Sequence, residues 1–371
     1  MTTRHDALIV GGGIVGAACA LYLARRGVRP LVLEADFVGS GATSAGMGHL
    51  TVMDDSPAQF ALSAHSCRLW SDLGEKHGQH WEDDPCGTLW VAAEEEELAL
   101  VAAKAAFYRD QGLPVEELSA SELLQAEPEL RHGLSGGLLV PGDRVIYAPK
   151  AVRWLMEEAV SLGAEVRERT WVRALEDRRV VCDSGPIEAD TIILAAGARS
   201  SRILPSLPLE PRKVHLVITD RYPGFCRHQI LELGYLKSAH EMSGESVAFN
   251  VQPRATQQVL IGSSRELVGW DKSVNRDLVH AMVERAVEYM PRLAALSVLR
   301  VWTGFRPASR DNLPFIGRWE PIDGLWISAG HEGLGITTSL ATGELLADLI
   351  VARKPTLDPG PFDPMRVAGG G

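Results

Sequence analysis

Closely spaced glycines near the amino terminus are the first residues with an evident chemical use, in the run Gly11-Gly12-Gly13-Ile14-Val15-Gly16. In a G-x-G-x-x-G turn the glycines allow a tight bend, close approach of the backbone to a pyrophosphate, and close packing of the following helix. Glu34 follows 18 residues after Gly16, where a carboxylate can bind the hydroxyls of an adenosine ribose and disfavours a ribose phosphate. The pattern predicts a site for FAD or NAD rather than NADP. Its expected contacts are Gly11, Gly13, Ile14, Val15, Gly16, Glu34 and Ala35.

A second group is the small-residue stretch 39–49, which is rich in glycine and hydroxyl side chains. Small side chains give a long flat cofactor clearance, while hydroxyls and backbone N–H groups can bind its phosphates and ring edges. Such a stretch in isolation is typical of an ordinary flexible loop, but its position directly after Glu34 favours cofactor binding. The expected contacts are Ala42, Thr43, Ser44, Gly46 and Met47.

Two later segments complete a nucleotide-binding domain. Residues 190–198 form a buried strand that ends in small residues, and residues 325–329 form a strand followed by a glycine-rich turn and a helix over 336–353. The positive end of that helix suits a reduced flavin, which carries negative charge on its ring. The expected contacts are Val172, Ala196, Gly197, Gly304, Gly330, Gly333, Leu334, Gly335, Ile336 and Thr337.

These residues require a strand, a turn, a helix and a second strand, which we predict over 6–10, 11–16, 14–26 and 29–34. The same region contains an uncharged run of 18 residues, 7–24, which also has the length of a membrane helix or signal peptide. Three consecutive glycines would weaken a membrane helix but serve a phosphate-binding turn. We therefore interpret the run as buried rather than membrane-inserted.

Composition excludes several classes of protein. The chain has 371 residues, enough for two domains, and its formal net charge of −11 argues against nucleic-acid binding. Its five scattered cysteines indicate neither a disulfide framework nor a zinc site, and we expect a cytoplasmic protein. His77 and His80 lack a surrounding metal motif, so no metal site is predicted.

With these motifs in place, the chain resembles the D-amino acid oxidase superfamily of FAD enzymes, in the branch of glycine oxidase and sarcosine oxidase. Within it, residues 248–254, 261–266 and 331–337 look like the flavin subunits of D-hydroxyproline dehydrogenases and opine oxidases. The resemblance spans most of the chain. Its markers are the glycine-rich turn with Glu34, Ala42-Thr43-Ser44, Leu194-Ala195-Ala196-Gly197-Ala198, Gly304-Phe305-Arg306-Pro307, the run 311–317, and Gly330-His331.

The resemblance implies an α/β fold, with a Rossmann-like FAD-binding domain and a second, mainly antiparallel-sheet substrate domain. The FAD-binding domain would comprise 1–84, 142–207 and 301–371, and the substrate domain 85–141 and 208–300. The sequence pattern agrees in outline. It predicts helices over 96–111, 150–162 and 275–290, and strands over 165–172, 213–219, 246–251 and 258–262.

The resemblance also assigns roles in oxidation of an amino acid at its α-carbon. Arg306 would grip the substrate carboxylate, although a surface ion pair with an acid such as Asp311 is the alternative from position alone. His331 would bind flavin or orient substrate, or else simply bond a backbone carbonyl in its turn. Glu332 would contact a substrate ammonium or hydroxyl, and Gly333 replaces an arginine of some relatives, which leaves room for a larger substrate. His49, Met47 and Asn250 complete the expected substrate contacts.

We expect hydride transfer from a D-amino or cyclic imino acid, such as D-hydroxyproline, to non-covalent FAD. Ala248, which is not basic, stands where several oxidases carry a base that activates oxygen, so a dehydrogenase is favoured over a peroxide-releasing oxidase of the glycine or sarcosine type. A flavin-bearing electron-transfer or scaffolding subunit is a further alternative. The resemblance allows for partner subunits with FMN or iron–sulfur centres in a hetero-oligomer, and for peripheral association with the respiratory chain at the inner face of the membrane.

Overall fold

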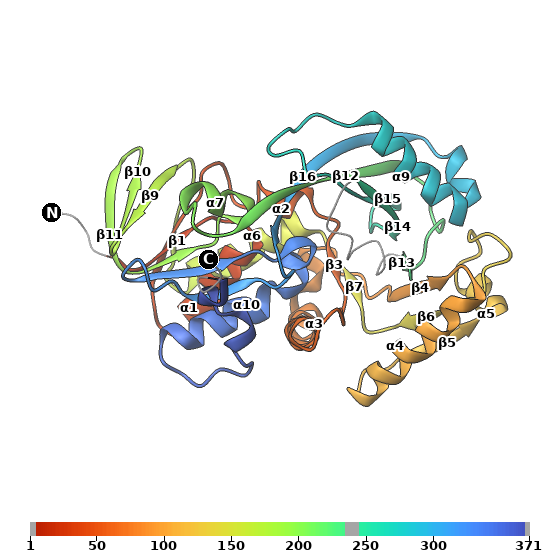
Figure 1. The fold of residues 1–371 in the computed structure, drawn as a ribbon, viewed down its shortest axis with the longest axis horizontal. Coiled ribbons are helices and arrows are strands. Elements are labelled where there is room, and N and C mark those ends of the chain that lie inside the picture. Colours follow the sequence, from red (N-terminus) through yellow and green to blue (C-terminus); the bar gives the residue numbers. More distant parts are fainter. Residues whose placement is uncertain (1–4, 234–244, 368–371) are drawn as a thin grey trace.

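The computed structural model describes residues 5–233 and 245–367. Two eight-stranded sheets lie next to each other along the long axis of the molecule (Figure 1). Both predicted sheet types are present, one largely parallel and one largely antiparallel. The fold is therefore mixed α/β, as predicted.

The first sheet has the order β17-β18-β11-β1-β2-β8, and β18, β11, β1, β2 and β8 run parallel. β9 and β10 extend β11 as antiparallel strands. Helices α1, α6 and α10 pack together against this sheet. The bounds of its strands are β1 His5–Val10, β2 Pro30–Leu33, β8 Glu165–Arg167, β9 Val172–Glu176, β10 Arg179–Cys182, β11 Gly185–Leu194, β17 Phe315–Arg318 and β18 Leu325–Ala329.

The second sheet has the order β16-β12-β15-β14-β13-β4-β6-β5. Helix α9 covers β14 and β15, and α4 lies against β4, β5 and β6 at the other end of the sheet (Figure 1). Its strands are β4 Thr88–Ala92, β5 Glu116–Ser119, β6 Gly136–Val140, β12 Leu209–Arg221, β13 Gln229–Glu232, β14 Ser246–Pro253, β15 Gln258–Arg265 and β16 Val298–Ser309.

The longer helices bury apolar faces between or beside the sheets. β3 His49–Leu50 and β7 Arg144–Val145 form a separate two-stranded ladder. The α-helices are α1 Ile14–Arg25, α2 Ala42–Ala45, α3 Pro57–His77, α4 Leu98–Asp110, α5 Ala120–Ala126, α6 Ala148–Ser161, α7 Ser200–Ile203, α9 Arg276–Tyr289 and α10 Gly335–Ile350. The 3-10 turns are η1 Gly78–His80, η2 Glu95–Glu97, η3 Gly197–Arg199, η4 Pro291–Ala295, η5 Glu332–Leu334, η6 Gly360–Phe362 and η7 Pro364–Val367.

The uncharged run 7–24 folds as predicted into β1, a turn and α1. Most of its residues are buried, because β1 is the middle of the parallel sheet and α1 packs between α6 and α10. No helix in the described ranges has the length and apolar character needed to cross a membrane. The lack of charge in this run therefore reflects burial inside the fold.

Two local predictions need correction. Residues 39–49 are not wholly a loop, because residues 42–45 form α2 and His49 begins β3. Residues 165–172 are not one strand: β8 ends at Arg167, and Val172 begins β9. Arg169, between them, adopts φ +52°, a conformation that interrupts a strand.

Candidate functional site

The glycine-rich turn connects the carboxyl end of β1 to α1. Gly11 adopts φ +112°, and a Cβ there would lie 2.5 Å from the Ala195 carbonyl oxygen. A Cβ on Gly16 would overlap the carbonyl oxygen of Gly11. α1 has neither a side-chain cap at Gly13 nor an acidic residue in its first turn. The positive end of the helix dipole therefore favours an anion at this turn.

Backbone N–H groups hold the carboxylate of Glu34 at the end of β2. Its Oε2 accepts a hydrogen bond from Gly12 N at 2.7 Å, and its Oε1 accepts one from Asp36 N at 2.9 Å. The residue is only 9% exposed. A carboxylate offers about four lone-pair positions, so Glu34 can also accept hydrogen bonds from ribose hydroxyls in the orientation that these two contacts fix.

The stretch 39–49 packs against α1, the second sheet and α10. Thr43 Oγ1 accepts a hydrogen bond from Ile14 N at 3.0 Å, which ties α2 to the start of α1. A Cβ on Gly46 would lie 2.7 Å from Ile336 Cδ1, and a Cβ on Gly304 would lie 2.6 Å from Ala45 Cβ. The small residues are therefore required for packing between segments that are distant in the sequence.

The turn between β18 and α10 buries a neutral histidine. Gly330 has φ +89°, and His331 is only 4% exposed, with its Nε2 at 3.1 Å from Thr342 Oγ1. Burial lowers the pKa of His331 to about 3, so the ring is uncharged near neutral pH. Nε2 thus pairs with the Thr342 hydroxyl on α10 and not with a backbone carbonyl, which was the structural alternative considered from sequence.

The structure brings Arg306 and Glu332 together, and a third residue, Arg212, joins them. Arg306 on β16 stands opposite Arg212 on β12. Glu332 Oε1 accepts hydrogen bonds from Arg212 Nη1 at 3.2 Å and from Arg306 Nη1 at 3.4 Å. Asp311, the alternative partner for Arg306, instead accepts from Arg366 Nε at 2.8 Å. Arg212 was not predicted from sequence, because the strand expected over 213–219 begins after it. Its position beside Arg306 follows from the pairing of β12 with β16, which the sequence alone does not reveal.

The arginines also fix the charge of Glu332. Burial by itself raises the pKa of this carboxyl, but Arg306, Arg265 and Arg212 together with the Gly333 N–H lower it to about 2. Gly333 lies against the arginine, since a Cβ there would be 3.3 Å from Arg306 Nη1. The cluster therefore combines an ionised carboxylate with guanidinium groups beside the start of α10.

The stretch 39–49, with Met47 and His49, meets the second sheet where Asn250 stands on β14. Met47 is in an apolar cluster with Leu216 and Leu260. Asn250 is 4% exposed and pairs in register with Gly262, over which the Met47 sulfur lies. The Thr337 hydroxyl on α10 donates to the His49 carbonyl at 2.8 Å. The sequence-predicted substrate residues thus meet where α10, the stretch 39–49 and the second sheet adjoin.

Three further predicted cofactor contacts, Ala196, Gly197 and Val172, lie around the same edge of the first sheet. Gly197 has φ +56° in η3, directly after the carboxyl end of β11. Ala196 packs partly buried beside it. Val172 begins β9 and packs in an apolar cluster that includes Val10 and Leu33, the last residues of β1 and β2. The glycine cradle, the helix N-termini of α1 and α10, and the fixed carboxylate of Glu34 together fit a dinucleotide.

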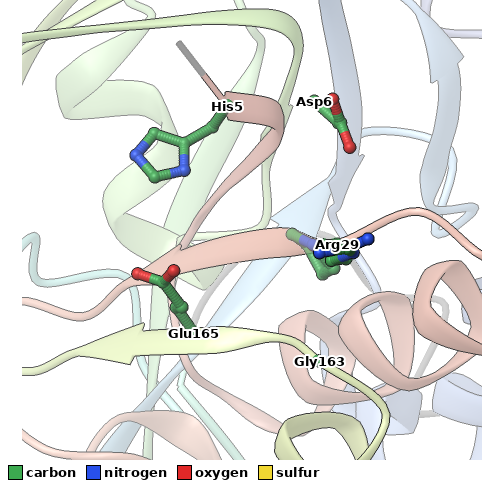
Figure 2. Close-up of a pocket in the computed structure, with 6 residues that line it drawn as sticks. His5, Asp6, Arg29, Gly163 and Glu165 are labelled. Carbon is green, nitrogen blue, oxygen red and sulfur yellow. The ribbon is translucent and has the colours of Figure 1, made fainter. Parts of the chain in front are cut away.

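A pocket elsewhere on the first sheet does not belong to this site. Figure 2 shows His5, Asp6, Arg29 and Glu165 around it, at the amino ends of β1, β2 and β8. In doubly wound sheets ligands bind beyond the carboxyl ends of the strands. The pocket therefore lies at the opposite edge from the glycine-rich turn.

Comparisons with known proteins agree with this geometry. The family model described as FAD dependent oxidoreductase (DAO) matches residues 6–349. The chain is 30% identical over 383 aligned residues to a glycine oxidase of Geobacillus kaustophilus, covering 100% of this chain and 99% of that protein. The crystal structure of glycine oxidase from Geobacillus kaustophilus superposes with a TM-score of 0.88 at 29% identity, covering 98% of this chain and 99% of that one.

A further solved structure shows the fold alone. L-proline dehydrogenase from P. horikoshii has a TM-score of 0.90, but only 24% sequence identity, over 100% of this chain and 99% of that one. The family match and the whole-length glycine oxidase relative therefore carry the assignment. The chain belongs to the DAO family of FAD-dependent oxidoreductases, in the branch of glycine oxidase and sarcosine oxidase.

Proposed function

We propose that the protein is an FAD-dependent oxidase of glycine or another small amino acid, which passes electrons to oxygen and releases hydrogen peroxide. The observation that carries this proposal is the guanidinium of Arg306, held by Glu332 and lying against Gly333 at the turn before α10. The arginine suits a substrate carboxylate because its planar donors form two parallel hydrogen bonds. The identity to glycine oxidase over the whole chain supports the oxidase.

This proposal replaces the dehydrogenase expected from sequence. The relative at 30% identity is named glycine oxidase, whereas the likeness to L-proline dehydrogenase at 24% identity concerns the fold alone. The non-basic Ala248 therefore does not outweigh the comparisons. D-Hydroxyproline becomes one member of a substrate panel rather than the leading substrate.

The residues around Arg306 have separate tasks in this function. FAD, when bound, would supply the acceptor for a hydride from the substrate α-carbon. Arg306 fixes the substrate carboxylate and thereby orients that carbon. Glu332 and Arg212 hold the guanidinium in place, and the neutral ring of His331 fixes the turn through Thr342.

Met47 contributes an apolar wall, which it forms with Leu216 and Leu260. Such a wall excludes water from the reacting groups and strengthens the electrostatic contacts made there. The packing of the stretch 39–49 would hold Met47 against a substrate bound beside the cofactor. Gly333 offers no side chain to this space, which allows substrates larger than glycine.

The test is an anaerobic substrate panel on the purified yellow protein. Glycine, sarcosine, D-alanine, D-hydroxyproline and L-proline are added in turn, and bleaching of the flavin absorption is followed. A substrate that bleaches the flavin is then oxidised in air, and one peroxide per product is expected. A colourless protein that FAD does not reconstitute would contradict the cofactor assignment. Fast bleaching without peroxide release in air would contradict the oxidase and favour a dehydrogenase with another acceptor.

Partner subunits and domain limits are further parts of the proposal. The substrate domain would comprise 85–141 and 208–300, and subunits with FMN or iron–sulfur centres would be required only if oxygen is not the acceptor. Purification from the native cell and measurement of mass in solution test for such partners. A single species that releases peroxide by itself would exclude a need for them.

A further inference from the structure

A series of aromatic rings crosses the core between α10 and the surface. Trp70 on α3 lies edge-on to Trp81, with ring centroids 5.9 Å apart, and Trp81 lies edge-on to Trp154 on α6 at 4.9 Å. The Trp154 ring is in turn 4.8 Å from that of His77, the last residue of α3. Three indoles therefore stand in series, each in contact with the next.

The inner end of this series is attached to the helix expected to face the cofactor. Trp70 Nε1 donates to the Ile336 carbonyl oxygen at 3.2 Å, and Ile336 is one of the predicted flavin contacts in the first turn of α10. Helix α3 lies beside α10 along this contact (Figure 1). Trp70 is 1% exposed, so the series begins inside the protein, next to the cofactor-binding segment.

The outer end of the series reaches water. Trp154 is 8% exposed, whereas Trp81 is fully buried. His77 is partly exposed, and the exposed His80 lies 6.4 Å from it. A small molecule in solution can therefore approach the Trp154 end but not the middle of the series.

The surroundings of Trp81 suit a ring that passes charge on. An indole N–H only donates hydrogen bonds, and an indole that loses an electron tends to release this proton to a nearby acceptor, which traps the positive charge. Among the described residues Trp81 Nε1 is buried without a hydrogen-bond partner. A positive charge on this ring therefore stays mobile and can move to Trp154.

Packing alone does not account for the order of the rings. Edge-to-face pairs contribute about 0.5–1.5 kcal/mol each, and any cluster of the same rings would supply this. Indole is among the side chains that most readily give up a single electron, and flavins carry out one-electron chemistry as well as hydride transfer. A series of indoles that leads from α10 to water is thus suited to moving single electrons.

We propose that Trp70, Trp81 and Trp154 form a tryptophan relay, which conducts single electrons from a reductant in solution to bound FAD when blue light excites the flavin. Trp70 gives one electron to the excited cofactor, Trp81 refills Trp70, and Trp154 refills Trp81. A thiol at the surface refills Trp154 and releases one proton to water, and two oxidised thiols join as a disulfide. Each round moves one electron to the cofactor, and no bond within the protein is made or broken.

The experiment follows the FAD-loaded protein under blue light without oxygen and without any amino acid. Dithiothreitol is the reductant, and bleaching of the flavin absorption is recorded against a sample kept in the dark. Trp81→Phe interrupts the relay but keeps an aromatic ring. Trp319→Phe is the matched control, because Trp319 is 4% exposed and packs in the other apolar cluster of the first sheet.

We expect light to bleach the wild type and Trp319→Phe at the same rate, and Trp81→Phe at least about tenfold more slowly, with equal flavin content in all three. A phenylalanine ring is much harder to oxidise than indole, so the electron cannot be replaced through it. Equal rates in Trp81→Phe and the wild type, equal slowing in Trp81→Phe and Trp319→Phe, or no bleaching of the wild type would overturn the relay.

A second variant keeps the test decisive if Trp81→Phe does not fold. Trp154→Phe removes the outer indole, and it should also slow bleaching at least about tenfold, while a thermal melt of the holoprotein shows whether packing is retained. Bleaching of a folded Trp154→Phe protein at the wild-type rate would overturn the route to the surface. Because no amino acid is added, the relay stands or fails separately from the proposed oxidase activity and requires only that FAD is bound.

Discussion

The two edges of the first sheet carry the same kinds of residue in different surroundings. At the amino edge, His5, Asp6, Arg29 and Glu165 line a surface pocket (Figure 2), and all but the partly exposed His5 are exposed. At the carboxyl edge, the side chains of Arg306 and Glu332 are 16% and 14% exposed and are bonded to each other. Each edge thus has a histidine, an acid and an arginine, but these side chains are largely buried only at the carboxyl edge.

The difference shows why residue type alone does not locate a site. Water screens the charges of the amino edge, and exposed ion pairs contribute little. At the carboxyl edge burial lowers the pKa of His331 to about 3, and the arginines lower that of Glu332 to about 2 despite burial. Two helices, α1 and α10, also begin there without a cap from the side chain of their own N-cap residue. Variants matched between the two edges test this contrast.

The largest effect is expected from a glycine at the start of α1, and a glycine just after the end of the same helix is its control. In Gly16→Ala the new Cβ would overlap the Gly11 carbonyl oxygen, so the pyrophosphate turn must open and FAD should be lost on purification. Gly27→Ala, near the other end of α1, has nothing within 4 Å of its Cβ but keeps φ +82°. It should cost only about 1 kcal/mol and keep its flavin. Flavin absorbance per protein and a thermal melt measure both, and a yellow Gly16→Ala protein would contradict the assigned turn.

The second-largest effect, on substrate binding and flavin reduction, is expected from replacing Arg306. Arg306→Ala should weaken the binding of acetate, which has a carboxylate but no amine, and slow substrate-dependent flavin reduction by about 100-fold or more, because a charge-assisted bidentate contact is lost. Arg306→Lys should recover only part of this, since an ammonium lacks the planar fork. Arg29→Ala at the amino edge should leave both measurements within about twofold. Normal reduction after Arg306→Ala would instead favour a scaffolding or electron-transfer subunit.

Much of the first sheet could be predicted because local signals and global packing agree there. The residues of β1, the glycine turn and α1 carry apolar runs and small residues in the order that the fold requires, and each element lies within a few residues of its expected limits. Arg306 and Glu332 were also predicted, from motifs adjoining the turn before α10. In these segments short-range sequence is sufficient.

The contacts between distant segments could not be predicted in the same way. Arg212 joins Glu332 only through the register of β12 with β16. Gln252 contacts Met47 across 205 positions of sequence, and no local pattern marks it as different from any polar strand residue. His331 pairs with Thr342, which lies 11 positions further along the chain in α10. Each of these depends on tertiary geometry that a single sequence does not express.

A smaller effect concerns the pH dependence of stability. Glu332 has a folded pKa of about 2 against 4.5 ordinarily, so its ionised form stabilises the fold above pH 4.5, and this stabilisation is lost as pH falls toward 2. The linkage corresponds to about 3 kcal/mol at pH 7 and about 2 kcal/mol at pH 3.5. Urea unfolding of wild type and Glu332→Gln at both pH values should show the difference between them shrinking on acidification. A difference that is constant with pH would mean that packing, not charge, links Glu332 to the arginines.

The smallest effect is expected at the amino edge, from Glu165→Gln. Glu165 is exposed and lies 3.8 Å from Arg167, itself 45% exposed, and exposed pairs of this kind contribute about 0–1 kcal/mol. The variant should unfold within about 0.5 kcal/mol of the wild type, with flavin content and reduction rate unchanged. The absence of an effect would be informative because Glu165 lines the pocket of Figure 2. A measurable loss of flavin reduction in Glu165→Gln would mean that the amino edge communicates with the carboxyl edge through β8 and β2, and the separation between the two edges would have to be abandoned.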